Sequence, residues 1–293
     1  MSDISATKER CEPFYEAYGK SPKRELEIFF GLTFCITWGL ASLQLLVPDF
    51  VAIIPEPPGA PKGDSWLYYL AVYGPNISAL ICLGLFGGKA AYVQVFKALL
   101  APSSLPRWLL WLAISFSIMP IGWLLMSALG ISWIGKADAL ILFVTVPLAL
   151  LTTNYLLYDA GTLGEELGWR GYAMPRLFRV MNPVPAGLLL GSIWAIWHAP
   201  AFLVGDDYQG GVQFIPFFIS LTTQGVVLAW IYLRTGGNWF LAGVVPHAVV
   251  NCSTQFMGFS GDGWMYALVP LFLAAFVSFD PVMHTNSQSL TTD

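Results

Sequence analysis

The segment Gly164–Tyr172 concentrates groups that can exchange protons, in a chain that is otherwise poor in charge. It reads G-E-E-L-G-W-R-G-Y and follows a long apolar run. One charge at membrane depth costs about 2.5–3.5 kcal/mol, so three charges within six residues are expected to be paired or in use. On an ideal helix Glu166 and Arg170 are i,i+4 neighbours that can form an ion pair. Glu165 points about 140° away from Arg170, so we expect its partner on another helix.

His198 lies in a second apolar segment. Gly187, Gly191 and His198 share one face of a helix over this segment. Small residues four apart let helices approach closely, so this face is expected to pack against protein rather than lipid. Taken singly, a buried histidine serves equally well as an interhelical hydrogen bonder.

A third apolar segment carries His247 and Asn251, which share a helix face with Gly243. Pro246, beside His247, has no backbone N–H to donate, which favours a local kink. This face is also expected to point into the protein.

The four groups on these three segments suit one kind of chemistry. A carboxylate such as Glu165 and an imidazole such as His198, on separate helices, can hold one water and deprotonate it. His247 and the amide of Asn251 one turn later can donate to a developing oxyanion. Together they describe acyl hydrolysis without a serine or cysteine nucleophile.

A zinc site is the alternative for the same side chains. Glu165, His198 and His247 form a known type of catalytic ligand set for Zn²⁺. We favour no metal and no other cofactor, because the amide of Asn251 suits an oxyanion better than zinc. In addition, Glu166 is expected to be committed to its arginine neighbour, and so to be unable to orient a ligating histidine.

Three motifs occur in order along the chain: E-E-x-x-x-R at 165–170, aromatic-x-x-x-His at 194–198 and His-x-x-x-Asn at 247–251. Together they resemble the CAAX protease and bacteriocin-processing family, which includes the type II CAAX prenyl endopeptidase (Ras-converting enzyme). The resemblance covers roughly residues 139–255. Trp194 stands where phenylalanine is commoner in the family, a conservative departure.

The resemblance implies an intramembrane endopeptidase of the glutamate type or the metallo type. It implies that Glu165 and His198 activate the water and that His247 and Asn251 form the oxyanion hole. Glu166 and Arg170 would shape the site. Trp169, Trp194 and Trp197 lie close enough in sequence to wall a pocket around it, and Asn76 and Asn154 are expected to be interhelical hydrogen bonders.

Composition predicts the setting. The 293 residues are 56% hydrophobic and only 11% charged, with a mean hydropathy of +0.63, whereas soluble domains are about 25% charged. We predict an all-α, polytopic membrane helix bundle in which about 20 apolar residues form each span. Eight runs qualify: 28–47, 66–86, 107–130, 139–160, 186–204, 213–233, 239–257 and 263–280.

The predicted domain organisation is simple. Residues 1–27 form a hydrophilic cytoplasmic segment, 28–280 a single transmembrane domain with its catalytic half at 139–257, and 281–293 a polar tail. With the N-terminus inside, all of the 14 Lys and Arg residues except Lys62 and Lys136 lie in inner segments. Both termini are therefore predicted to be cytoplasmic, and the site to open to the cytoplasmic side.

Two rival functions remain open. One is a non-catalytic membrane scaffold or bacteriocin-immunity protein, and the other is an ion- or proton-coupled transporter, for which we find no repeat symmetry. The expected partners are membrane lipids and a hydrophobic or lipidated peptide or protein substrate. No basic face suits nucleic acid. The expected location is the bacterial cell membrane, with the endoplasmic reticulum membrane as the alternative.

Overall fold

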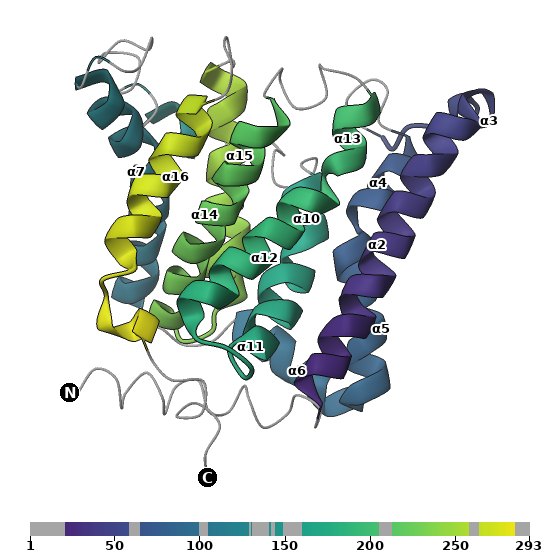
Figure 1. Ribbon diagram of the computed structural model, residues 1–293, viewed down its shortest axis with the longest axis horizontal. Coiled ribbons are helices and arrows are strands. Elements are labelled where there is room, and N and C mark those ends of the chain that lie inside the picture. Colours follow the sequence, from purple (N-terminus) through teal and green to yellow (C-terminus); the bar gives the residue numbers. More distant parts are fainter. Residues whose placement is uncertain are drawn as a thin grey trace.

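The computed structural model describes residues 21–58, 65–99, 105–128, 130, 141, 144–148, 160–204, 213–257 and 264–284. Within these ranges every regular element is helical, which confirms the all-α prediction (Figure 1). The elements that concern the site are α2 (Pro22–Leu46), α3 (Pro48–Ala52), α4 (Trp66–Val72), α5 (Gly74–Phe86), α6 (Gly88–Leu99), α7 (Leu105–Ala128), α10 (Ala160–Glu166), η1 (Leu167–Ala173), α11 (Met174–Leu177), α12 (Pro183–Trp197), α13 (Ala199–Val204), α14 (Phe214–Arg234), η3 (Phe240–Val244), α15 (Val245–Met257), α16 (Trp264–Val277) and η4 (Pro281–His284).

Three described helices are long and apolar enough to cross a membrane: Pro22–Leu46, Pro183–Leu203 and Phe214–Arg234. The pair α4 and α5, bent by 56° at a short break, makes a fourth if it is one span. The chain is thus a membrane protein with several apolar helices, and the count of eight spans stays a prediction. Most of the predicted span 139–160 lies outside the described residues, as do Asn154, most of the N-terminal segment and most of the polar tail.

The break between α4 and α5 brings the first half of the chain onto the segment Gly164–Tyr172. Pro75 cannot donate a backbone hydrogen bond and so ends one helix at the start of the next. Gly164 packs against the ring of Tyr73, and Gly168 packs against Pro75 so closely that a Cβ there would lie 2.6 Å from the Pro75 backbone. Close packing at these two glycines therefore fixes the segment that carries the glutamates.

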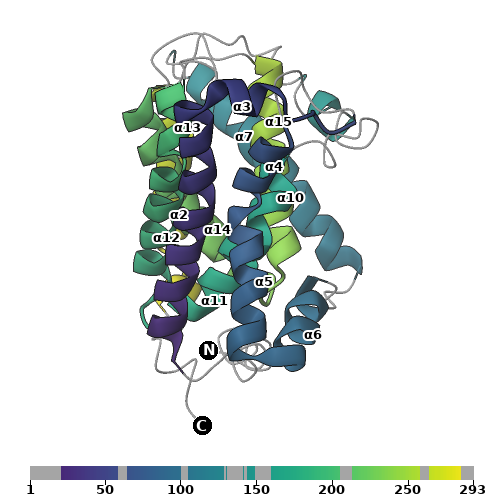
Figure 2. The same ribbon diagram turned by 90° about the vertical axis from the view of Figure 1, so that its right-hand side faces the viewer.

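Helices α12 and α14 approach each other through glycines, as the spacing in the second apolar segment predicts. Gly187 faces the backbone of Gly225 and Val226, and Gly191 faces the backbone of Leu221. The two helices lie side by side in the bundle (Figures 1 and 2). The predicted inward-facing side of α12, which also carries His198, is confirmed.

Candidate active site

The segment with the two glutamates changes helix type immediately after them. It is α-helical to Glu166 and then π-helical over Leu167–Ala173, a rare form that frequently marks functional sites. Asn76 of α5 holds this change in place, because its Nδ2 donates to the Leu163 carbonyl at 2.6 Å and its Oδ1 accepts from the Gly168 N–H at 3.0 Å. The interhelical role expected of Asn76 is confirmed, and its position beside the glutamates is new.

Glu165 is held by two indole groups. Its Oε2 accepts hydrogen bonds from Trp194 Nε1 at 2.6 Å and from Trp169 Nε1 at 3.2 Å, and the side chain is only 3% exposed. One donor therefore comes from another helix, as predicted, and the other from its own helix. Neither donor is a cation, and the Oε1 atom takes no hydrogen bond from the described residues. That oxygen is the one available to a water.

His198 stands at the end of α12, where the helix breaks before α13. Its Nδ1 lies 2.8 Å from the backbone carbonyl of Trp194. Because a carbonyl oxygen only accepts, Nδ1 carries the proton and Nε2 keeps its lone pair. The ring packs edge-on against Trp197 and Phe217, with centroids 4.7 and 5.1 Å away. His198 is thus in the tautomer that a general base requires.

Glu166 has two partners rather than one. Its Oε1 lies 2.7 Å from Arg170 Nη1 and 2.8 Å from His247 Nδ1. The ion pair with Arg170 was predicted, but the expectation that Glu166 would be committed to Arg170 alone is wrong. Gly243 faces Oε2 of Glu166 without a side chain of its own, so η3 can lie against the carboxylate. The close approach of these two helices brings His247 within reach.

His247 follows a second π-helical turn, η3, and lies next to Pro246 in the first turn of α15. The irregularity predicted from the proline is present. Because Glu166 accepts from Nδ1, the ring can donate from Nε2 only as an imidazolium, and Glu166 is then its counter-ion. Asn251 is partly exposed one helical turn later, on the same face.

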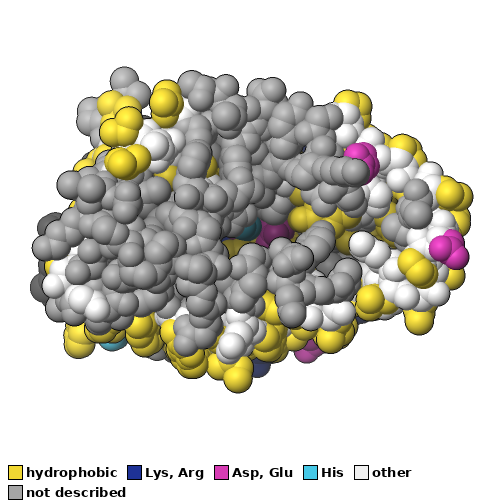
Figure 3. All heavy atoms as spheres, turned by 90° about the horizontal axis from the view of Figure 1, so that it is seen from above, with side chains coloured by type: hydrophobic (Ala, Val, Ile, Leu, Met, Phe, Trp, Pro, Cys, Tyr) yellow, Lys and Arg dark blue, Asp and Glu magenta, His cyan; other side chains and the backbone are white. Residues whose placement is uncertain are grey.

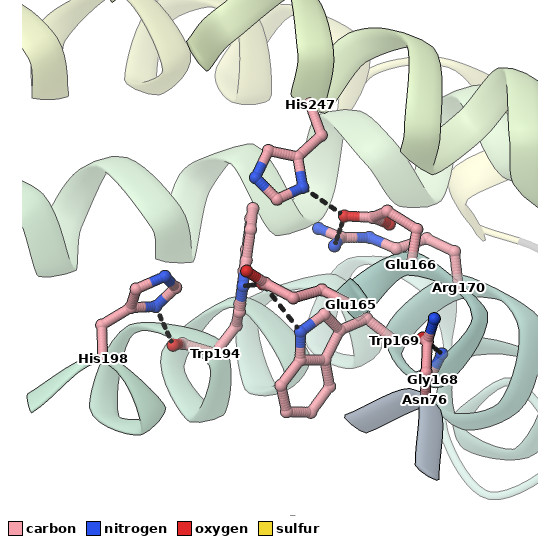
Figure 4. A network of polar contacts seen from close by, with 9 residues as sticks. All are labelled: Asn76, Glu165, Glu166, Gly168, Trp169, Arg170, Trp194, His198 and His247. Carbon is pink, nitrogen blue, oxygen red and sulfur yellow. Dashed lines mark hydrogen bonds and ion pairs between the residues drawn. The ribbon is translucent and has the colours of Figure 1, made fainter. Parts of the chain in front are cut away.

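Trp194 contacts four of these residues, Glu165, Arg170, His198 and His247 (Figure 4). Beyond its bond to Glu165, its ring lies 4.3 Å beneath the guanidinium carbon of Arg170 and 5.2 Å from the ring of His247. Its backbone carbonyl sets the tautomer of His198. Together with Trp169 and Trp197, whose ring centroids are 5.9 Å apart, it forms the predicted aromatic wall.

A zinc ion would require Glu165, His198 and His247 to converge on one point. Both histidines donate their Nδ1 protons to oxygen acceptors, as metal-binding histidines usually do. In the part of the chain that the structure describes, however, no three His, Cys, Asp or Glu side chains gather closely enough to hold one ion. Glu165, His198 and His247 do not fit a zinc ion as they are arranged.

Comparison with known proteins agrees with the motifs. Residues 139–253 match the family model described as Type II CAAX prenyl endopeptidase Rce1-like. A curated protein named CAAX prenyl protease 2, from Methanococcus maripaludis, is 31% identical over 137 residues, which cover 44% of this chain and 50% of the relative. The chain thus spans about half the length of the curated relative it matches. The resemblance inferred from the three motifs is confirmed.

Proposed function

Because residues 139–253 match the family model of Rce1-like type II CAAX prenyl endopeptidases, we propose that the chain is an intramembrane endopeptidase. Its substrate is a hydrophobic or lipidated peptide, cleaved near the C-terminus. The observation that carries this proposal is the state of Glu165. Both hydrogen bonds that the described residues give to this buried acidic side chain come from neutral indole N–H groups. An acidic side chain at this depth is costly unless it is used.

Each group has a role in hydrolysis. A water between Oε1 of Glu165 and Nε2 of His198 gives up a proton as it attacks the peptide carbonyl carbon. The oxygen of that carbonyl becomes negative, and His247 and Asn251 donate hydrogen bonds to it. The tetrahedral intermediate then collapses, the C–N bond breaks, and the leaving amine takes the proton.

Glu166 and Arg170 serve the site indirectly. The carboxylate of Glu166 keeps His247 oriented and balances its charge. Arg170 neutralises Glu166 and stacks over Trp194.

The test is hydrolysis of a lipopeptide library by the purified protein, with products identified by mass spectrometry. Wild type should cleave a subset of peptides, and Glu165→Gln should cleave none while eluting and melting as wild type does. Glu27→Gln, which neutralises an exposed carboxylate in the second turn of α2, is the matched control and should remain active. Equal activity of Glu165→Gln and Glu27→Gln would contradict the proposal and favour a scaffold or a transporter.

A further inference from the structure

Helix α6 has two faces of opposite character. Ala91, Val95 and Ala98 share one side of the helix, and all three are buried. The opposite side is exposed and presents two lysines and two apolar side chains within about 100° of arc. We call these four residues the outer face: Lys89, Val93, Phe96 and Lys97. Val93 is 43% exposed and Phe96 is 48% exposed.

The buried face of α6 packs against both π-helical turns of the candidate active site. Val95 and Trp239 lie against Gly171 of η1, where a Cβ would be 3.4 and 3.5 Å from their side chains. Trp239, the residue before η3, donates from Nε1 to the Val95 carbonyl at 2.8 Å. Asn238 donates from Nδ2 to the carbonyl of Leu99 at 3.4 Å, at the end of the helix, where carbonyls lack intrahelical partners. Helix α6 therefore joins the segment that carries the glutamates to the turn that leads into α15.

The outer face lies close to the apolar surface of α5. This helix belongs to the bent pair that is long and apolar enough to cross a membrane, and its penultimate residue, Leu85, is 67% exposed. The chain then turns at Gly88, whose φ of 58° favours glycine. Tyr92 of α6 donates to the Leu80 carbonyl of α5 at 2.5 Å, so α6 lies beside the last turns of the apolar helix (Figure 2). We therefore expect α6 to lie at the edge of the hydrocarbon layer.

The side chains of the outer face suit the boundary between lipid headgroups and acyl chains. Among the described residues no acidic side chain pairs with Lys89 or Lys97, and α6 itself contains no Asp or Glu. A lysine can keep its apolar stem on the protein while its ammonium group reaches the polar layer. Val93 and Phe96 can then enter the apolar boundary. A helix with this pattern lies in the membrane interface, where attraction to anionic lipids strengthens its binding.

The two ends of the molecule differ in surface charge. At the end that holds α6, the exposed Lys23 and Arg24 at the start of α2 add to the charge of Lys89 and Lys97 (Figure 1). Seen from the opposite end, where α3 carries the exposed Asp49, the described surface shows acidic side chains, and basic ones only at its rim (Figure 3). Anionic headgroups are therefore attracted to the end that holds α6.

We propose that the outer face of α6 binds the headgroups of anionic phospholipids, and that the bound lipid holds η1 and η3 in their active arrangement. The phosphate accepts hydrogen bonds from the ammonium groups of Lys89 and Lys97, and Val93 and Phe96 contact the acyl chains. The lipid site goes beyond the proposed peptidase activity, whereas its effect on the rate rests on that activity. The lipid composition of the membrane thereby regulates hydrolysis.

The lipid site is tested by fluorescence quenching of the full chain in vesicles of phosphatidylcholine and phosphatidylglycerol. Cys11 and the exposed Cys35 are first replaced by serine, and the remaining two cysteines are buried. A bimane is then attached through Ala90→Cys, at an exposed position beside the outer face. A small fraction of one lipid or the other carries a nitroxide near its headgroup. The bimane should be quenched several-fold more strongly when phosphatidylglycerol carries the nitroxide.

Charge-removing variants assign this preference to α6. Lys89→Gln with Lys97→Gln should abolish it. Lys23→Gln with Arg24→Gln removes the same charge from the start of α2 at the same end, and should retain it. Equal quenching by the two lipids in wild type, or a preference that survives the loss of both α6 lysines, would overturn the inference. Quenching by neither lipid would also overturn it, and would indicate that protein, such as residues 1–20 or a partner, covers the outer face.

The effect on the site is tested by hydrolysis of one library peptide in vesicles with and without phosphatidylglycerol. Wild type and the α2 variant should gain several-fold more rate from phosphatidylglycerol than the α6 variant does, with the same peptide and the same vesicles. Equal gains in the α2 and α6 variants would overturn the effect on the rate and leave the lipid site intact. Hydrolysis in no sample would overturn the peptidase proposal and the rate effect with it, whereas the quenching experiment needs no turnover and still decides the lipid site.

Discussion

The indole Nε1 of Trp194 donates a 2.6 Å hydrogen bond to Oε2 of Glu165, across the interface between α12 and α10. Phenylalanine, the commoner residue in the resembling family, has no N–H to offer. What looked like a conservative departure therefore gives this chain an additional group that orients the carboxylate. The ring of Trp194 also lies between Arg170 and the two histidines.

Trp194→Phe should lower kcat with little change in KM. Phenylalanine keeps an aromatic ring at this position, although a smaller one, but Glu165 loses its shorter hydrogen bond. A hydrogen bond to a charged group contributes about 1.5–3 kcal/mol, which corresponds to roughly a 10- to 150-fold change in rate. Trp197→Phe is the matched control, since the described residues offer no acceptor to the buried Nε1 of Trp197. Steady-state kinetics that fail to separate the two variants would exclude a role for the Trp194 N–H.

Glu165→Gln and His198→Ala should each lower kcat by about 10²–10⁴-fold, the usual contribution of general acid–base groups. The double variant should be scarcely slower than either single variant, because both side chains act on one water. If the fold-loss in kcat of the double variant equalled the product of the two single fold-losses, the two groups would act independently. Single-turnover rates on the best library peptide, with thermal melts to confirm folding, make this comparison.

Gly243→Ala should inactivate the protein. A Cβ at this position would collide with Oε2 of Glu166, and moving that carboxylate disturbs its contacts with Arg170 and His247. Gly39→Ala on α2 is the control, because nothing lies within 4 Å of its Cβ position. Alanine in a helix is favoured over glycine by about 0.5–1 kcal/mol, so Gly39→Ala should melt no lower than wild type. Full activity in Gly243→Ala would show that the site tolerates a shift of Glu166.

Helical periodicity explains why part of the site could be predicted. The i,i+4 pairing of Glu166 with Arg170 depends on one helix alone, and so do the inward faces that carry Gly187 and Gly243. These predictions hold in the structure. The three motifs likewise identified the matched region without any knowledge of how the helices pack.

Contacts between segments that are distant in sequence could not be predicted from helical periodicity. His247 and Glu166 are 81 residues apart, and Asn76 and Gly168 are 92 apart. Which inward faces meet depends on helix crossing angles and on close approach at Gly168 and Gly243, which a pattern of residue types does not determine. The burial of every residue from 164 to 178 is equally hard to predict from sequence, because an apolar residue facing lipid and one facing protein look alike.

Asp280 gives a prediction about stability and pH. It follows the end of α16 and accepts hydrogen bonds from Arg234 at 2.6 Å and from Trp230 Nε1 at 2.7 Å. Burial favours the neutral acid, but these bonds and the Val282 N–H outweigh it and hold the pKa of Asp280 below the ordinary value for an aspartate. A lowered folded pKa stabilises the fold above the unfolded pKa, and this stabilisation is lost as pH falls through the folded value.

Thermal melts in detergent should therefore show different melting temperatures for wild type and Asp280→Asn. They are recorded from about pH 3 to about pH 7, a range that brackets the ordinary carboxyl pKa of about 4. Wild type should melt higher near neutral pH, and the difference should shrink below about pH 4. Because the other carboxylates are the same in both proteins, the effect of their titration cancels in the difference between the two melting temperatures. A difference that is constant with pH would show that the charge of Asp280 does not stabilise the fold.

The last prediction concerns metal. If Glu165 and His198 act on water directly, activity should survive exhaustive treatment with a chelator, and elemental analysis should find well under one zinc per chain. If the carboxylate and histidines are ligands, activity should fall with metal loss and return with Zn²⁺, because a catalytic zinc needs three protein ligands and an open position. The hydrogen bonds at Nδ1 of His198 and His247 suit either role, so tautomers alone do not decide. The spacing of the described side chains favours the direct role. Zinc content measured on Glu165→Gln and His198→Ala beside wild type gives a readout independent of turnover: a ligand role requires both variants to lose zinc that wild type retains.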